Sequence, residues 1–159
     1  MYYNNKPIKA YYFSSSNGYT ESSLNVFNEY QEYLTIVESP FDQYNTHTIE
    51  IPKQEFCTKL DIQCNEITIT NIVKDKSNRI SSITINNKVF KGTELRKLLS
   101  LRSTDITIKQ NNNIIIITTN GYGHGVGMSQ YGANYLAKQG YTYKEILNYY
   151  YQDIKIDSI

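Results

Sequence analysis

A glycine-dense stretch near the C-terminus is the part of this sequence whose residue types and spacing could do chemistry. Residues 121–132 hold five of the eight glycines in the chain, arranged around His124. Glycines at this density cost backbone entropy, so the loop is expected to need positive φ angles or a very close approach of another chain. The stretch predicts a shelf that presents His124 and directs backbone N–H groups outward, ahead of a helix. A tight glycine corner with a satisfied histidine is the alternative.

The glycine spacing fits neither of the common phosphate-binding loops. A dinucleotide fingerprint needs Gly-x-Gly-x-x-Gly, and the third glycine would fall on Val126 or Met128. No Lys-Ser or Lys-Thr pair follows, as a nucleotide phosphate loop requires. His124 can gain and lose a proton near neutral pH, which leaves general acid–base chemistry or hydrogen bonding to a polar ligand.

The elements that position this loop are mostly strands in the middle of the chain and helices at its end. The Asn86-Asn87 pair predicts a hairpin turn, and Thr142 with Glu145 forms a capping box before the last helix. The pattern predicts an α+β fold, with antiparallel strands in the middle and two closing C-terminal helices. Strands are expected at 6–13, 66–73, 80–85, 88–90, 106–109 and 113–118, and helices at 53–60, 93–99 (capped by Thr93), 130–139 and 142–150.

Length, charge and hydropathy limit the classes of function. The 159 residues suffice for one domain, and the formal net charge of +1 without a basic run makes nucleic acid an unexpected partner. The longest aliphatic run, 114–117, is far shorter than a membrane span, and the N-terminus lacks the pattern of a signal peptide. We therefore expect neither a membrane anchor nor an export signal in this chain, and no cofactor.

Two cysteines, Cys57 and Cys64, are too few for a disulfide framework, and buried free thiols are expected. The alternative is a zinc site that adds His47 and a fourth ligand. The spacing between the cysteines is wider than in the tight pairs of ordinary structural zinc sites. We therefore predict no metal site.

Four collinear stretches resemble the stage II sporulation protein D and amidase-enhancer family. The most specific is Gly-Tyr-Gly-His-Gly-Val-Gly-Met-Ser-Gln-Tyr-Gly-Ala at 121–133, followed by Gly140 and by 143–150. Residues 6–21 resemble the serine-rich loop of the family, with Asn17 where a glycine is usual. Residues 33–42 and 91–104 resemble the segments between these two motifs, so the resemblance covers nearly the whole chain.

The resemblance implies a membrane-anchored, extracytoplasmic lytic transglycosylase that cleaves peptide-free glycan strands of peptidoglycan during sporulation, beside a partner amidase. One carboxylic acid protonates the glycosidic oxygen and then acts as the base. In the family this group is a glutamate in a segment before the serine-rich loop. Here that loop begins at Ser14, so we expect the catalytic glutamate to be missing. Residues 1–159 are then a single partial domain, with a serine-rich region (1–44), a strand-rich middle (45–112) and a closing glycine-loop region (113–159).

The resemblance also assigns roles to particular residues. His124 receives a supporting catalytic role, and Glu21 and Asp42 beside the expected cleft are interpreted as surface or turn-capping carboxylates. For Ser129 the alternative is simple helix capping. A non-catalytic module that binds glycan or stimulates an amidase stays open as an alternative function. The candidate substrate-binding residues are Ser14, Ser15, Ser16, Tyr19, Gly123, Gly125, Ser129, Gln130 and Tyr131.

Overall fold

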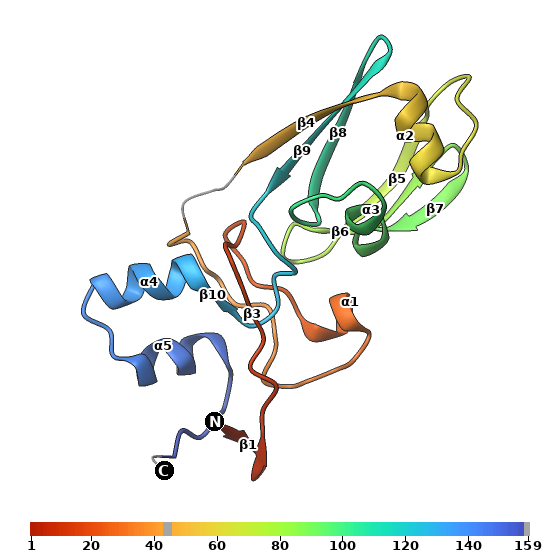
Figure 1. Ribbon diagram of the computed structural model, residues 1–159. Coiled ribbons are helices and arrows are strands. Elements are labelled where there is room, and N and C mark those ends of the chain that lie inside the picture. The colour runs from red at the N-terminus through yellow and green to blue at the C-terminus, as the bar shows by residue number, and fades with distance from the viewer. Residues whose placement is uncertain (43–45, 158–159) are drawn as a thin grey trace. The chain divides into compact units, whose positions relative to one another are not determined.

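A computed structural model describes residues 1–42 and 46–157 of the chain (Figure 1). The chain divides into two compact units. The first, here called the glycine-loop unit, is formed by residues 1–44 together with 122–159, and the second, here called the sheet unit, by 45–121.

The sheet unit holds two three-stranded antiparallel sheets, with strand orders β4-β9-β8 and β5-β6-β7. The α+β architecture with antiparallel strands in the middle of the chain is therefore confirmed. The strands are β4 (His47–Pro52), β5 (Ile69–Lys74), β6 (Ile80–Ile85), β7 (Lys88–Lys91), β8 (Asp105–Asn111) and β9 (Ile114–Asn120), and the helices are α2 (Lys53–Leu60) and α3 (Gly92–Leu98).

Alternation of side chains along the strands builds the core of the sheet unit. In β9, Ile115 and Ile117 are fully buried, while their neighbours along the strand are only half-buried. The hairpin between β6 and β7 turns through Asn86 and Asn87, whose φ angles of 46° and 64° are those of a turn with two left-handed residues. The core also takes residues from α2 and α3, and consists of Ile51, Phe56, Leu60, Ile80, Ile83, Ile85, Phe90, Leu95, Leu99, Leu101, Ile106, Ile115 and Ile117.

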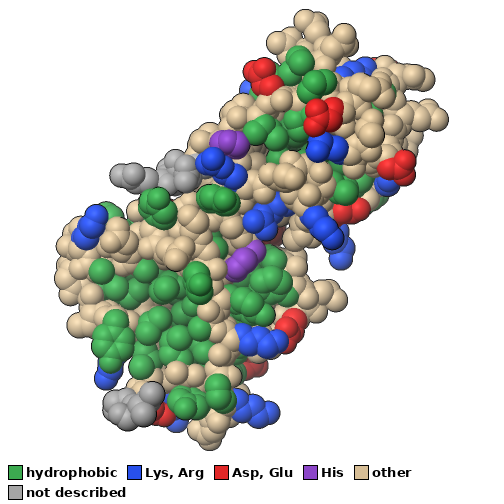
Figure 2. All heavy atoms as spheres, viewed as in Figure 1, with side chains coloured by type: hydrophobic (Ala, Val, Ile, Leu, Met, Phe, Trp, Pro, Cys, Tyr) green, Lys and Arg blue, Asp and Glu red, His purple; other side chains and the backbone are tan. Residues whose placement is uncertain are grey.

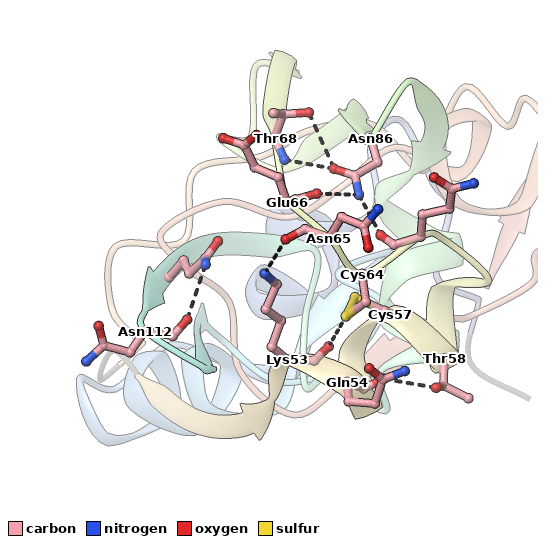
Figure 3. Close-up of a disulfide and its surroundings, with 12 residues drawn as sticks. Lys53, Gln54, Cys57, Thr58, Cys64, Asn65, Glu66, Thr68, Asn86 and Asn112 are labelled. Carbon is pink, nitrogen blue, oxygen red and sulfur yellow. Dashed lines mark hydrogen bonds between the residues drawn. A yellow bond between two sulfur atoms is a disulfide. The ribbon is translucent and has the colours of Figure 1, made fainter.

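The two cysteines correct the expectation of free thiols. Cys57 in α2 and Cys64 in the following loop form a disulfide, with Cα atoms 5.6 Å apart (Figure 3). The bond ties the loop back onto the helix that precedes it. It also removes the zinc alternative, because both sulfurs are bonded to each other. His47, the other residue of the zinc alternative, lies at the first end of β4, whereas α2 with Cys57 follows the last residue of that strand.

The strands of the glycine-loop unit are much shorter, at two residues each. Its helices α4 and α5 pack together, as Figure 1 shows, and confirm the two closing helices. The expected strand over 6–13 is wrong as a single element: residues 6–7 pair with residues 2–3, and residues 12–13 pair in parallel with 128–129. The elements are β1 (Tyr2–Tyr3), β2 (Lys6–Pro7), β3 (Tyr12–Phe13), α1 (Ser23–Phe27), β10 (Met128–Ser129), α4 (Gln130–Lys138) and α5 (Tyr143–Tyr150).

Two of the helix caps agree with those considered from the sequence, and one does not. Ser129 caps α4 by accepting a hydrogen bond from Gly132 N, and Thr142 and Glu145 form the predicted capping box of α5. Thr93 does not cap α3, because the helix starts one residue earlier, at Gly92. A Cβ atom at Gly92 would lie 2.0 Å from the carbonyl oxygen of Ile80, so this position next to β6 needs a glycine.

Candidate functional site

The glycine loop adopts the positive φ angles that its composition predicts. Gly123, Gly125 and Gly127 have φ angles of 120°, 85° and 78°. The close approach comes from the N-terminal segment of the same unit: a Cβ at Gly127 would lie 2.0 Å from Tyr11 O, and one at Gly123 would lie 2.7 Å from Phe13 Cβ. At these two positions, intramolecular packing therefore accounts for the glycines.

The serine-rich loop lies directly against the glycine loop, although the two are far apart in the sequence. Ser15 and Tyr122 exchange two backbone hydrogen bonds, of 3.1 and 2.8 Å. Glu21 N donates to Gly125 O at 2.7 Å, and Tyr131 N donates to Ser14 O at 3.1 Å. The structure thus brings together the two segments that carry all the candidate binding residues.

A buried hydrogen-bond network around Asp42 fixes both loops. Ser129 Oγ donates to Asp42 Oδ1 at 2.7 Å, while Ser16 N and Ser39 Oγ both donate to Oδ2 at 3.0 Å. Ser39 Oγ also lies 2.9 Å from the hydroxyl of Tyr150 in α5. Asp42 as a residue is 4% exposed, and these donors replace the water shell of its carboxylate. The network joins the serine-rich loop, the start of α4 and the core side of α5.

The interpretation of Glu21 and Asp42 as surface groups is wrong, because only 1% of Glu21 and 4% of Asp42 is exposed. The turn-capping alternative fits Glu21, whereas Asp42 links the serine-rich loop to the start of α4. Glu21 Oε1 accepts hydrogen bonds from Ser22 N at 2.6 Å and from Asn25 Nδ2 at 2.9 Å, at the start of α1. Both carboxylates stabilise loops from within: Glu21 accepts from a backbone N–H and a side-chain amide, and Asp42 from a backbone N–H and two hydroxyls.

His124 is half-buried, and its ring lies among aromatic side chains. The ring centroids of Tyr11, Phe13 and Phe27 lie 6.1, 6.0 and 5.4 Å from that of the imidazole. Nδ1 accepts a hydrogen bond from Val126 N at 3.0 Å. This bond needs the lone pair on Nδ1, so the proton of the neutral ring is assigned to Nε2. A second proton on Nδ1 would break the bond.

The remaining candidate residues divide into buried and accessible sets. Ser15, Ser16 and Ser129 are 0–1% exposed, and Gly125 is buried as well. Ser14 and Gly123 are half-buried, while Tyr19, Gln130 and Tyr131 are exposed. The helix-capping alternative for Ser129 agrees with its contacts.

Sequence reasoning missed a second surface feature of the glycine-loop unit, a pocket of about 200 Å³ on α4 lined by Phe41, Tyr131, Asn134, Tyr135 and Lys138. Figure 2 shows hydrophobic side chains, with tyrosine counted among them, gathered on the face that carries α4 and α5. The spacing of the four helical residues, i, i+3, i+4 and i+7, was the available signal. A larger polar pocket in the sheet unit, of about 540 Å³, contains none of the candidate residues.

Within residues 1–42 and 46–157, no helix has the length and apolar character needed to cross a bilayer. In the same residues, no group of three or more histidine, cysteine, aspartate or glutamate side chains is arranged to hold a metal ion.

Comparison of this chain with known proteins finds relatives named stage II sporulation protein D and amidase enhancer. No protein-family model matches it. Stage II sporulation protein D of Bacillus amyloliquefaciens is 43% identical to it over 161 residues, and the protein of that name from Bacillus subtilis is 40% identical over 159. Each alignment covers 97% of this chain and 46% of the relative. The amidase enhancer of Bacillus subtilis is 28% identical over 98% of this chain and 30% of its own length.

The chain thus spans about half the length, or less, of the curated relatives that it matches. The aligned part includes both loops and the buried network between them, because the alignments leave only 2–3% of the chain uncovered. The chain is therefore homologous to stage II sporulation protein D and to the amidase enhancer over nearly its whole length, as the glycine-loop and serine-rich motifs predicted.

Proposed function

We propose that this chain binds the glycan strands of peptidoglycan and takes part in cell-wall remodelling during sporulation. The observation that carries the proposal is the pairing of the serine-rich loop with the glycine loop, through the backbone of Ser15 and Tyr122. These loops carry the motifs that resemble the family, and stage II sporulation protein D of Bacillus amyloliquefaciens is 43% identical to the chain. They present hydroxyl, amide and imidazole groups, and such groups can pair with sugar hydroxyls.

The proposed site divides its residues between contact and support. The accessible set, Ser14, Tyr19, Gly123, His124, Gln130 and Tyr131, contacts the glycan. Ser15, Ser16, Gly125 and Ser129 hold the loops in place, since their side chains or backbone are buried. His124 presents Nε2–H as a hydrogen-bond donor, because Nδ1 is held by Val126 N. A rigid donor on a shaped loop suits the recognition of a neutral sugar oxygen.

Cleavage of the strand is a separate step that needs a carboxylic acid at the glycosidic oxygen. The two carboxylates beside the loops, Glu21 and Asp42, are buried and already accept hydrogen bonds. We therefore assign glycan binding, and not bond cleavage, to these 159 residues taken alone. In a transglycosylase the acid would approach the strand from another part of the protein.

Stimulation of a cell-wall amidase is the second candidate function. The amidase enhancer aligns with 98% of this chain at 28% identity. A chain that binds both glycan and an amidase could increase the local concentration of substrate for that amidase. This function is tested by adding the chain to a purified cell-wall amidase and measuring peptide release; an unchanged rate at saturating chain concentration would exclude it.

The disulfide favours an extracytoplasmic location. Disulfides persist in oxidising compartments and are rare in the bacterial cytosol. The Cys57–Cys64 bond therefore agrees with action at the cell envelope, where peptidoglycan lies. Labelling of thiols in protein isolated under acid quench would test this: reactive thiols in most molecules would contradict an envelope location.

The glycan site is tested by comparing the two histidines of the chain. His124→Asn keeps an oxygen acceptor for Val126 N but removes the Nε2 edge of the ring, and His47→Asn in β4 is the matched control. We expect His124→Asn to weaken binding to purified glycan strands several-fold, the scale of one lost hydrogen bond, about 1 kcal/mol. Co-sedimentation and thermal unfolding are measured on the same preparations. Unchanged binding per folded molecule would refute the site.

A further inference from the structure

The two cysteines of the disulfide differ in their access to solvent. Cys57, inside α2, is 1% exposed, whereas Cys64 is half-buried. Cys64 also lines a surface pocket of about 340 Å³, and Cys57 does not. This volume lies within the range of pockets that hold small molecules. The other lining residues are Pro52, Lys53, Gln54 and Asn113. A small nucleophile from solvent therefore reaches the disulfide from the side of Cys64.

The charge of this pocket favours an incoming anion. Of the described residues that line it, only Lys53 is charged. The Lys53 ammonium donates a hydrogen bond to Asn65 O at 3.0 Å, next to the disulfide in the chain (Figure 3). The nucleophile in thiol–disulfide exchange is a thiolate, so a positive charge held beside the bond stabilises its approach.

Cys57 is held in place independently of the disulfide. Its neighbours Phe56 and Leu60 in α2 are buried in the core of the sheet unit. The carbonyl oxygen of Cys57 accepts a hydrogen bond from Ile62 N at 3.1 Å, which turns the chain back at the end of the helix. A thiol released at Cys57 therefore stays within reach of Cys64, as the resolving thiol of a reversible exchange needs to.

The loop after α2, residues 61–68, contains no buried residue and depends on a few attachments. One is the disulfide at Cys64. Another is the side chain of Asn86 in the β6–β7 turn, whose Nδ2 donates to the carbonyl oxygens of Gln63 and Glu66, both at 2.8 Å. Exposed hydrogen bonds of this kind contribute about 1 kcal/mol each, so the covalent bond is the strongest attachment. The same loop lines the polar pocket of about 540 Å³.

We propose that Cys64 is a site of reversible thiolation by a low-molecular-weight thiol, with Cys57 as the resolving thiol. The incoming thiolate attacks Cys64 Sγ and forms a new S–S bond with it. The Cys57–Cys64 bond breaks, its electron pair passes to Cys57 Sγ, and this sulfur takes up a proton from water. Cys57 is thereby reduced and the incoming thiol oxidised, so no other oxidant is needed. Thiolation releases the loop after α2 and changes the polar pocket that it lines.

The test is exchange of the folded, intact chain with reduced glutathione. The reaction is quenched with acid, free thiols are blocked with N-ethylmaleimide, and trypsin cleaves after Lys59, which separates the two cysteines. Mass spectrometry should find glutathione on Cys64 and maleimide on Cys57, about tenfold or more above the reverse arrangement, because buried cysteines are inert. An even distribution over the two cysteines, or no adduct in folded protein, would overturn the proposal.

Single-cysteine variants measure the same difference without the disulfide. Cys57→Ser leaves only the thiol of Cys64, and Cys64→Ser leaves only that of Cys57. In folded protein the Cys64 thiol should react with dithionitrobenzoate about tenfold faster than the Cys57 thiol, and in urea the two rates should be equal. Equal rates in the folded variants would show that access does not distinguish the two sulfurs, and would contradict the assignment.

The charge of the pocket is tested with two lysine variants. Lys53→Gln should slow thiolation by glutathione about two- to threefold at low salt, the scale of one exposed charge interaction. Lys59→Gln, an exposed lysine of α2 outside the pocket, is the matched control and should leave the rate unchanged. Equal rates for the two variants would contradict the role of Lys53.

Release of the loop is measured by amide hydrogen exchange on the thiolated protein. Exchange should rise in peptides from residues 61–68 and stay unchanged in peptides from 1–42, because the disulfide ties only the loop after α2. Unchanged exchange in 61–68 would overturn the release. Glycan binding by the thiolated protein should be unaltered, so the outcome of this test is independent of the proposed function.

Discussion

The sheet unit and the glycine-loop unit are each stabilised by a different kind of interaction. The sheet unit has strands of four to seven residues around an apolar core of isoleucine, leucine and phenylalanine. The strands of the glycine-loop unit are two residues long, and hydroxyl groups and the Asp42 carboxylate are buried beside a core rich in tyrosine. Apolar burial tolerates moderate exchange of side chains, whereas a polar network needs each partner in place. All candidate binding residues lie in the glycine-loop unit.

Among the changes considered for the glycine-loop unit, we expect Gly127→Ala to lower the free energy of unfolding most. In Gly127→Ala the Cβ would meet Tyr11 O at 2.0 Å, so β3 must move away from β10. We expect a loss of about 3 kcal/mol or more in the free energy of unfolding. Gly140→Ala is the matched control, because its φ of 92° is also positive but its Cβ would meet nothing within 4 Å. The control should cost only about 1 kcal/mol.

Urea unfolding followed by hydrogen exchange on peptides from each unit measures this difference. The increase in exchange for Gly127→Ala should appear in peptides from residues 1–42 and 122–157. Equal destabilisation by the two substitutions would show that the close approach to Tyr11 has no energetic weight.

Removal of the disulfide should affect the stability of the sheet unit without affecting binding by the glycine-loop unit. Reduction, or the double change Cys57→Ala and Cys64→Ala, should lower the free energy of unfolding by about 2–3 kcal/mol, because the loop after α2 is no longer closed in the unfolded chain. Binding to glycan strands should be unchanged at temperatures where the protein stays folded. The double variant itself should show no response to dithiothreitol. Loss of glycan binding in folded, reduced protein would contradict the assignment of binding to the other unit.

Alkaline pH should weaken the glycine-loop unit through its buried tyrosines. Burial raises the pKa of Tyr151 to about 12, while its hydroxyl donates to Tyr11 O at 2.6 Å. The unfolded state ionises near pH 10, so this contribution is complete below pH 10 and is lost as the pH rises to about 12. The contribution at stake is about 2 kcal/mol. In Tyr151→Phe the fall in stability between pH 10 and pH 12 should be smaller, as measured by urea unfolding; an equal fall would contradict it.

The smallest expected effect is on bond cleavage, where we expect none. Incubation of the 159-residue chain with peptide-free glycan strands should release no anhydro-sugar products, because Glu21 and Asp42 are buried and hydrogen-bonded. Mass spectrometry against a heat-inactivated sample checks this. Products above that background would show that a group in this chain acts as the acid, and Glu21→Gln and His124→Asn would then identify it.

Residue patterns predicted much of the sheet unit correctly. The bounds of α2 and β6 and the Asn86-Asn87 hairpin follow from apolar alternation and turn chemistry, which act between near neighbours. The capping box of α5 is equally local. The disulfide was missed because pairing of two cysteines depends on how the loop after α2 folds back. Helix α1 was missed because it has a single turn and a Ser22 cap without a clear apolar period.

The sequence by itself determined the α+β class, the closing helices and the resemblance to the sporulation family, because each rests on local periodicity or on a contiguous motif. Only the tertiary structure decided which motif residues are accessible. Ser15, Ser16 and Ser129 have the same chemistry as an exposed serine, but contacts with segments far along the chain bury them. The α4 pocket depends in the same way on Phe41, which reaches Tyr135 only after the chain has folded back on itself. Burial and long-range stacking are set by the three-dimensional path of the chain, which no window of neighbouring residues encodes.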